Sequence, residues 1–108
     1  MMGGIYTTRP IKEIGSKAFR RLLKGREIAV SSHALDHIER KERKIFKEEE
    51  LIRIAGKDNP RKCHLQENGR YSAYYRKPGG YTKIVIELEN DNAVIVSFMN
   101  VIELPKIR

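Results

Sequence analysis

The spacing of apolar residues changes near residue 61. Before this point apolar residues recur every three or four positions, as on one face of a helix, and after it they alternate with polar residues, as in a strand. Helices followed by strands are typical of α+β domains. The pattern therefore predicts an α+β fold in which N-terminal helices pack on one face of a four-stranded antiparallel sheet, connected as a meander. We expect a single domain over residues 1–108, with a loose lead-in at 1–9, a mainly helical part at 10–56 and the antiparallel sheet at 61–102.

Three helices are expected in the first half of the chain, over residues 10–24, 31–46 and 47–55. The hydroxyl of Ser31 or Ser32 can cap the second helix by accepting a bond from an unpaired amide of its first turn. The third helix begins with three glutamates, which the positive end of a helix favours. Residues 26–30 are interpreted as a short strand or an extended link.

Four strands are expected after these helices, over residues 61–66, 70–77, 81–89 and 93–102. Asn68-Gly69 favours a tight hairpin turn with positive φ angles. The last strand is the most apolar and is expected to be central or covered on both faces. If residues 61–66 are an exposed edge, a partner protein can pair with them.

The charge indicates a polyanionic partner. The chain has 22 basic and 14 acidic residues, for a net charge of +8. Such an excess favours binding to nucleic acid or to an anionic membrane surface. No apolar run has the length of a membrane span and no secretory signal is present at the N-terminus, so we expect no membrane partner. The single cysteine excludes an intramolecular disulfide and fits the reducing cytoplasm.

The predicted helix over 31–46 has two different faces. Ala34, Ile38 and Ile45 form an apolar line that suits a core. A second line, about a quarter-turn away, carries two imidazoles and two cations, groups that exchange protons or bind phosphate. The residues on this second line are His33, His37, Arg40 and Lys44.

Three interpretations of the two histidines remain open. One is acid–base catalysis, which needs one well-placed imidazole. Another is a metal site, but this requires further ligands, such as Cys63, His64 or Asp36, and the segment HALDH lacks the glutamate of metalloprotease helices. We predict no metal. The last is a pair of surface histidines on a basic helix.

The strands add candidate contacts for a nucleic acid. Strand alternation places Tyr74 on one face with two arginines, so that cations and a ring for base stacking are close together. The alternative is a solvated sheet surface whose tyrosines pack across strands. Ser97 is a hydroxyl within an apolar strand; it either bonds a neighbouring backbone group or positions a phosphate oxygen. The candidate phosphate contacts are Arg40, Lys44, Arg70, Arg76 and Lys83.

The order of these segments resembles that of a nuclease superfamily. SSHALDHIERKERK, the acidic-start helix KEEELIRI, the Asn59-Pro60 turn and the strand ending in VIVSF are similar to the small RelE/BrnT-like toxins. They are closest to the uncharacterised and phage-encoded branches of the barnase–EndoU–colicin–RelE superfamily. Relatives often carry His-Ala-x-x-Arg at the helix start. Here His33 and Ala34 match, and His37 stands where arginine is usual. Ser97 matches a Ser or Thr of the final strand.

The resemblance implies a toxin that cleaves RNA without metal or cofactor, with RNA as substrate and an antitoxin as possible partner. A base takes the proton of a ribose 2′-OH, which attacks phosphorus, while an acid protonates the leaving oxygen. By position His33 would be the base or acid, Ser97 a phosphate-positioning group and His37 a second acid–base or phosphate contact. To these the helix and strand phases add Arg40 and Arg76 as transition-state clamps. The alternatives are a non-catalytic nucleic-acid-binding module and a protein-interaction or inhibitor domain.

Overall fold

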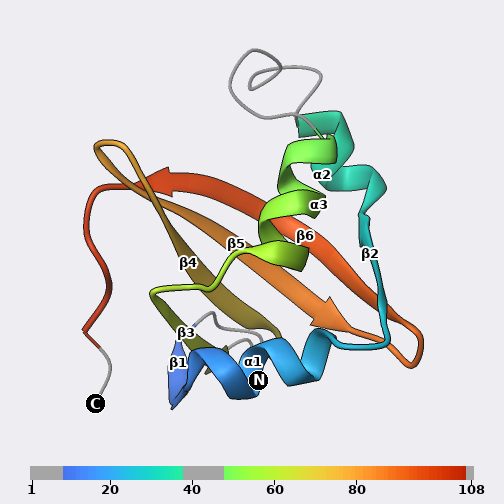
Figure 1. Cartoon of the computed structure of the whole chain (residues 1–108), viewed down its shortest axis with the longest axis horizontal. Helices are drawn as coiled ribbons and strands as arrows, with labels where there is room; N and C mark the ends of the chain where they lie inside the picture. Colours follow the sequence, from blue (N-terminus) through green and yellow to red (C-terminus); the bar gives the residue numbers. More distant parts are fainter. Residues whose placement is uncertain (1–8, 38–47, 107–108) are drawn as a thin grey trace, which may run out of the picture.

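A six-stranded mixed sheet forms the centre of the molecule (Figure 1). The computed structural model describes residues 9–37 and 48–106. In chain order the elements are β1 (Pro10–Ile14), α1 (Ser16–Leu23), β2 (Glu27–Val30), α2 (Ser32–His37), α3 (Glu48–Lys57), β3 (Lys62–Gln66), β4 (Tyr71–Lys77), β5 (Gly80–Leu88) and β6 (Asn92–Val101). The strand order is β1-β3-β4-β5-β6-β2. No helix among the described residues is long and apolar enough to cross a membrane.

The prediction of a four-stranded antiparallel meander with N-terminal helices was wrong. The meander β3-β4-β5-β6 exists, but a further strand pairs with each of its edges. β1 is antiparallel to β3, and β2 is parallel to β6, which makes the sheet mixed. Residues 26–30, read as a strand or a link, contain the strand β2, and the last strand β6 is central, as expected.

The segment 10–14 was predicted as helix and is a strand. Its apolar residues, Ile11 and Ile14, have a spacing that suits a helix, but five residues are too few for this pattern to decide. The edge of β3 supplies hydrogen-bond partners that the isolated segment lacks, and the pairing of Ile14 with Cys63 turns Ile14 toward the core. The helix begins only after Gly15, at Ser16.

The edge prediction for residues 61–66 was also wrong. β3 lies between β1 and β4, so its backbone groups are already paired on both sides. The edges of the described sheet are β1 and β2. A partner that extends the sheet would therefore meet one of these two strands.

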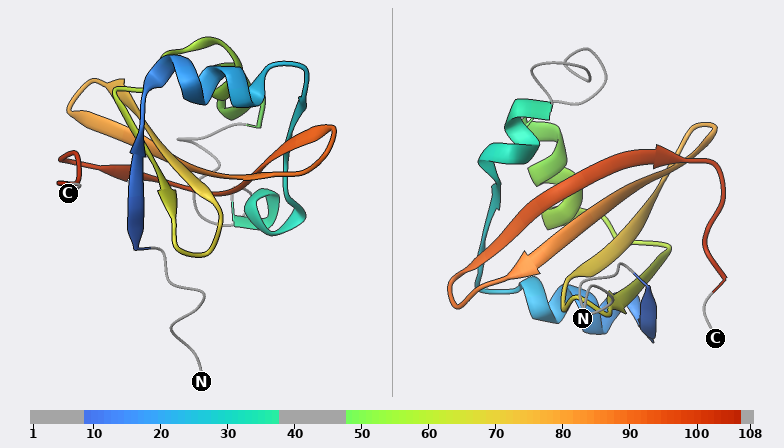
Figure 2. Two further views of the ribbon diagram at one scale, coloured as in Figure 1. Left: turned by 90° about the horizontal axis from the view of Figure 1, so that it is seen from below. Right: turned by 180° about the vertical axis from the view of Figure 1, so that it is seen from behind.

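One face of the sheet carries the core. The helices α1 and α3 lie on this face, whereas α2 lies against β6 on the other side of the sheet (Figure 2). Phe19 of α1 and Leu51 of α3 are fully buried with Ile84 and Ile86 of β5. The ring of Phe19 also lies 6.1 Å from that of Tyr71, between centroids. These aliphatic and aromatic contacts hold the sheet rigid enough to position residues on its opposite face.

The β3–β4 hairpin differs from the expected tight turn. Gly69 has a φ of 89°, but no described residue other than glycine has a positive φ, so Asn68 does not adopt the second positive angle that a type I′ turn needs. Instead the side chain of Asn68 accepts hydrogen bonds from the backbone N–H of Arg70 (3.0 Å) and from Nε2 of Gln66 (3.1 Å). Asn68 therefore closes the loop through its side chain.

The β4–β5 turn contains two glycines with positive φ, Gly79 (83°) and Gly80 (157°). A Cβ added to Gly80 would overlap the carbonyl oxygen of Val101, whereas one added to Gly79 would meet open space. We expect Gly80→Ala to lower the free energy of unfolding by about 2 to 4 kcal/mol, and Gly79→Ala by about 1 kcal/mol, in urea titrations. Equal losses in the two variants would contradict the clash.

Candidate functional site

The first turn of α2 is attached directly to the sheet. Because β2 runs parallel to β6, the chain leaves β2 beside Ile95, whose carbonyl accepts a hydrogen bond from the N–H of Ser31 (2.9 Å). Oγ of Ser31 accepts a bond from the N–H of Ala34 (3.1 Å), which confirms the predicted cap and identifies Ser31 as its residue. Ala34 is buried, and His33 is exposed. The helix thus begins with its imidazole at the surface next to β6.

A β-bulge in β6 controls which way Ser97 faces. Ile95 pairs with Ile86 and Ser97 with Val85, so Val96 is one residue too many on β6. Uninterrupted alternation would place Ser97 on the core side with Ile95. The bulge instead turns Ser97 to the opposite face, where it is exposed. Although it belongs to an apolar strand, the hydroxyl of Ser97 is therefore not enclosed by the core.

His33 and Ser97 line the same hollow. Its volume is about 190 Å³, and it lies between the start of α2 and the bulged part of β6. The hollow brings one imidazole and one hydroxyl to a surface that also exposes the side chain of Met99. The lining residues are His33, Ala34, Val96, Ser97, Phe98 and Met99.

The sheet face that carries Ser97 also carries the candidate residues of β4 and β5. Tyr74 of β4 pairs with Lys83 of β5, and Lys83 pairs with Met99 of β6. Nζ of Lys83 lies 5.9 Å from the centroid of the Tyr74 ring. Because Tyr74 is only 5% exposed, its ring holds Lys83 in place and does not offer an open platform for a base.

The two arginines of this face differ in their surroundings. Nε of Arg70 donates to Oε1 of Glu87 at 2.9 Å, so its charge is paired. The side chain of Arg76 is exposed and forms no hydrogen bond or ion pair with a described residue. Arg76 pairs with Tyr81 near the β4–β5 turn, whereas Ser97 pairs with Val85. Tyr81 and Val85 are four residues apart on β5, a distance of about 13 Å along the strand. Arg76 therefore does not line the hollow of His33.

A third histidine shares this polar face and was missed as a candidate acid–base group. His64 pairs with Ser72, and its ring lies 5.9 Å from that of Tyr74, between centroids. The side chain is buried, and its Nδ1 has no hydrogen-bond partner among the described residues. From the sequence, strand alternation predicts that His64 and Cys63 face opposite sides of the sheet. Only the register between β3 and β4 shows that His64 lies on the face that carries Tyr74.

Burial affects the protonation of this cluster. It lowers the pKa of His64, and the charges of Lys83 and Lys62 lower it further, against a smaller opposing effect of Glu13. Burial also lowers the pKa of Lys83 and raises that of Tyr74. Burial therefore shifts the pKa of each of these three groups in the direction that disfavours its charged form.

Other predicted residues lie partly or wholly outside the described structure. The backbone of His37 ends α2, but its side chain is not described. Arg40, Lys44 and the rest of the predicted helix over 38–46 lie outside the described residues. Their proposed roles stay predictions.

The ligands considered for zinc do not come together in the described part of the chain. Cys63 and His64 are neighbours on β3 and point to opposite faces. Sγ of Cys63 donates to the carbonyl of Ile14 at 3.0 Å, and burial raises the pKa of this thiol to about 11. Within residues 9–37 and 48–106, no three His, Cys, Asp or Glu side chains are grouped as metal ligands.

Comparisons with known proteins do not assign the chain to a family. No protein-family model matches it, and neither the curated proteins nor the solved structures contain a significant match. The function is therefore argued from the site itself.

The lowered pKa of His64 makes stability depend on pH. In the unfolded chain this imidazole returns to a value near 6.5. Below that pH the unfolded chain binds a proton that the folded protein resists, so the free energy of unfolding falls as the pH falls. Between about pH 7.5 and 5.5 we expect a smaller loss of stability in His64→Gln than in the unsubstituted protein, by urea unfolding. The same pH dependence in both proteins would show that His64 is not desolvated.

Proposed function

We propose that this protein is a metal-independent endoribonuclease of the toxin type that acts on RNA in the cytoplasm. The observation that supports this proposal is the hollow shared by His33 and Ser97, which pairs a proton-exchanging imidazole with a phosphate-binding hydroxyl. The net charge of +8 supports a polyanionic substrate independently.

The chemistry follows from the groups at the hollow. His33 takes the proton of a ribose 2′-OH, and the 2′-oxygen then attacks the adjacent phosphorus. The bond from phosphorus to the 5′-oxygen breaks, and this oxygen leaves with a proton from an acid, for which we propose His37. The products are a 2′,3′-cyclic phosphate and a free 5′-hydroxyl. Ser97 donates its hydroxyl hydrogen to a phosphate oxygen and orients it for attack.

The polar sheet face extends the site along the RNA. Lys83 and Arg76 supply cations to flanking phosphates, and the paired Arg70 contributes less because Glu87 offsets its charge. The ring of Tyr74 holds the ammonium group of Lys83 through a cation–π contact. Arg40 and Lys44 are proposed to add phosphate contacts.

An antitoxin protein remains part of the toxin proposal. The strands that can accept a partner strand in the described sheet are its edges, β1 and β2. β2 leads into α2, so a partner added there would lie next to the hollow of His33. A nucleic-acid-binding module without catalysis is the second candidate, because the basic sheet face alone would serve it.

The decisive experiment is RNA cleavage in EDTA. We expect the protein to cleave total RNA, His33→Ala to lose about 1,000-fold in rate and Ser97→Ala about 10- to 100-fold, because one removes the base and the other a phosphate contact. Ser32→Ala is the matched control, since it deletes an exposed hydroxyl next to His33 outside the hollow. It should cleave at the normal rate.

Two outcomes would contradict this proposal. Intact RNA with every protein would favour binding without chemistry. Cleavage that persists in His33→Ala would place the chemistry elsewhere.

The roles of the two arginines can be separated by binding. We expect Arg76→Gln to weaken RNA binding and to reduce the slope of log affinity against log salt by about 0.7, the value for one phosphate contact on a single strand. The double variant Arg70→Gln/Glu87→Gln removes the ion pair without changing net charge and should leave the slope unchanged. The measurement is fluorescence anisotropy over a salt series. A larger effect in the double variant would reverse the assignment.

A further inference from the structure

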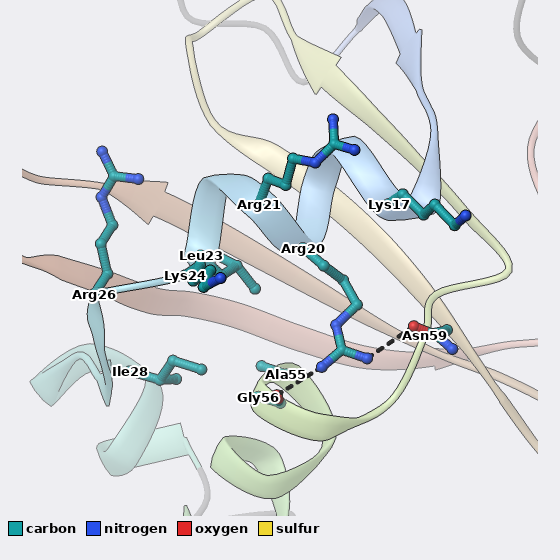
Figure 3. A pocket seen from close by; sticks show the side chains of 10 residues that line it. All are labelled: Lys17, Arg20, Arg21, Leu23, Lys24, Arg26, Ile28, Ala55, Gly56 and Asn59. Atoms are coloured by element: carbon teal, nitrogen blue, oxygen red, sulfur yellow. Dashed lines mark hydrogen bonds between the residues drawn. The ribbon is translucent and has the colours of Figure 1, made fainter.

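A second basic surface lies on the helix side of the sheet. A hollow of about 620 Å³ opens between the end of α1, β2 and the end of α3 (Figure 3). Five of its lining residues are cations and none is acidic. The lining residues are Lys17, Arg20, Arg21, Leu23, Lys24, Arg26, Ile28, Ala55, Gly56 and Asn59.

Neutral acceptors hold two of these cations. Arg20 donates from Nη1 to Oδ1 of Asn59 (2.8 Å) and from Nη2 to the carbonyl of Gly56 (3.3 Å). Arg26 donates from Nε to the carbonyl of Glu89 (2.9 Å) and from Nη1 to that of Leu22. These bonds fix both guanidiniums in place, and among the described residues no carboxylate forms an ion pair with either of them. The two arginines are thus preorganised for an anion.

The other three cations are free of such bonds. The side chains of Lys17, Arg21 and Lys24 make no hydrogen bond or ion pair with a described residue, and all three residues are exposed. Lys17 and Arg21 are four residues apart on one side of α1, and Lys24 directly follows the last residue of this helix, so the three charges span about 10 Å. The helix therefore carries a row of uncompensated positive charge beside the hollow.

The directions of the side chains indicate the kind of anion. In Figure 3 Arg21 and Arg26 extend toward the top of the view from separate places and Lys17 extends to the right, so the five charges do not converge on one point. A compact anion such as free phosphate would contact few of them. A strand of nucleic acid carries a charge at every nucleotide and can cross the whole row. A protein partner would need an unusually dense run of carboxylates to do the same.

We propose that α1 and the turn that follows it bind the phosphate backbone of a nucleic-acid strand. The surface lies across the sheet from the hollow of His33 and Ser97, because α1 and α2 lie on opposite sides (Figure 2). If the protein is the ribonuclease proposed above, its substrate must contact both surfaces. We therefore infer that the substrate is a long RNA that reaches both sides of the molecule.

Binding to an uncleavable strand tests the surface without catalysis. The probe is a fluorescent oligodeoxythymidylate of about 20 nucleotides, which has no 2′-OH. We expect the triple variant Lys17→Gln/Arg21→Gln/Lys24→Gln to bind it about 10- to 100-fold more weakly and to reduce the salt slope by about 2. The matched control is Lys12→Gln/Arg61→Gln/Lys106→Gln, which removes two lysines and one arginine at exposed positions outside the hollow. Circular dichroism of both variants confirms the fold.

Two results would overturn the proposal. One is an equal loss of affinity in both triple variants, which would make net charge the whole effect. The other is displacement of the oligonucleotide by polyglutamate at equal charge concentration, which would show that any acidic chain fits.

Cleavage assays connect this surface to the substrate. We expect the α1 triple variant to cleave long RNA with a lower kcat/KM and a tetranucleotide at the normal rate, since a short substrate reaches only the hollow of His33. An equal loss on both substrates would contradict the long-RNA inference. If the unsubstituted protein cleaves neither substrate, the proposed ribonuclease function fails, and the oligonucleotide binding still decides the role of α1.

Discussion

The parallel pairing of β2 with β6 is the constraint on which the candidate site depends. This pairing brings Ser31 to Ile95, and the cap at Ser31 then starts α2 with His33 beside the last strand. It also gives α3 a strand to pack against: Gly56 lies so close to Ile28 that an added Cβ would be 3.2 Å from its Cδ1. A parallel neighbour requires a long connection, and here that connection carries both helices and most of the sheet. The candidate residue His33 is therefore positioned by the contact between β2 and β6.

The bulge at Val96 supplies the other half of the site. Without it Ser97 would pair with the buried Ile84 and its side chain would face the core, where a hydroxyl needs a partner. With it, β6 keeps Ile95 and Phe98 in the core and turns Ser97 outward, next to α2. One inserted residue thus changes a core position into a surface position without loss of the apolar contacts on either side.

The alternating segments of the chain were predictable, and the long-range pairings were not. The strands β3 to β6 are predicted by the alternation of apolar and polar residues. The cap residue Ser31 marks the start of α2, and the three glutamates mark the start of α3. The five residues of β1 fit a helical pattern equally well, since only the edge of β3 favours a strand there. The bulge also leaves no sign in the apolar pattern, so alternation assigns Ser97 to the wrong face. Of the candidate residues, His33 was selected from the sequence as part of a polar helix face, whereas the contact of His64 with Tyr74 depends on a register that only the folded sheet shows.

The size of the hollow explains why a basic surface elsewhere would matter. At about 190 Å³ it is smaller than the clefts that bind whole ligands, so of the proposed RNA substrate it would enclose little more than one phosphate and its ribose. On the same sheet face Lys83 is partly buried against Tyr74, and Arg70 is paired with Glu87. These two cations would therefore orient an RNA strand more than they would attract it. Attraction over distance comes from charges that remain in water, and in the described structure a row of these lies on α1. The two proposals therefore divide the work: the sheet face would position one phosphate, and the helix side would retain the nucleic-acid chain that carries it.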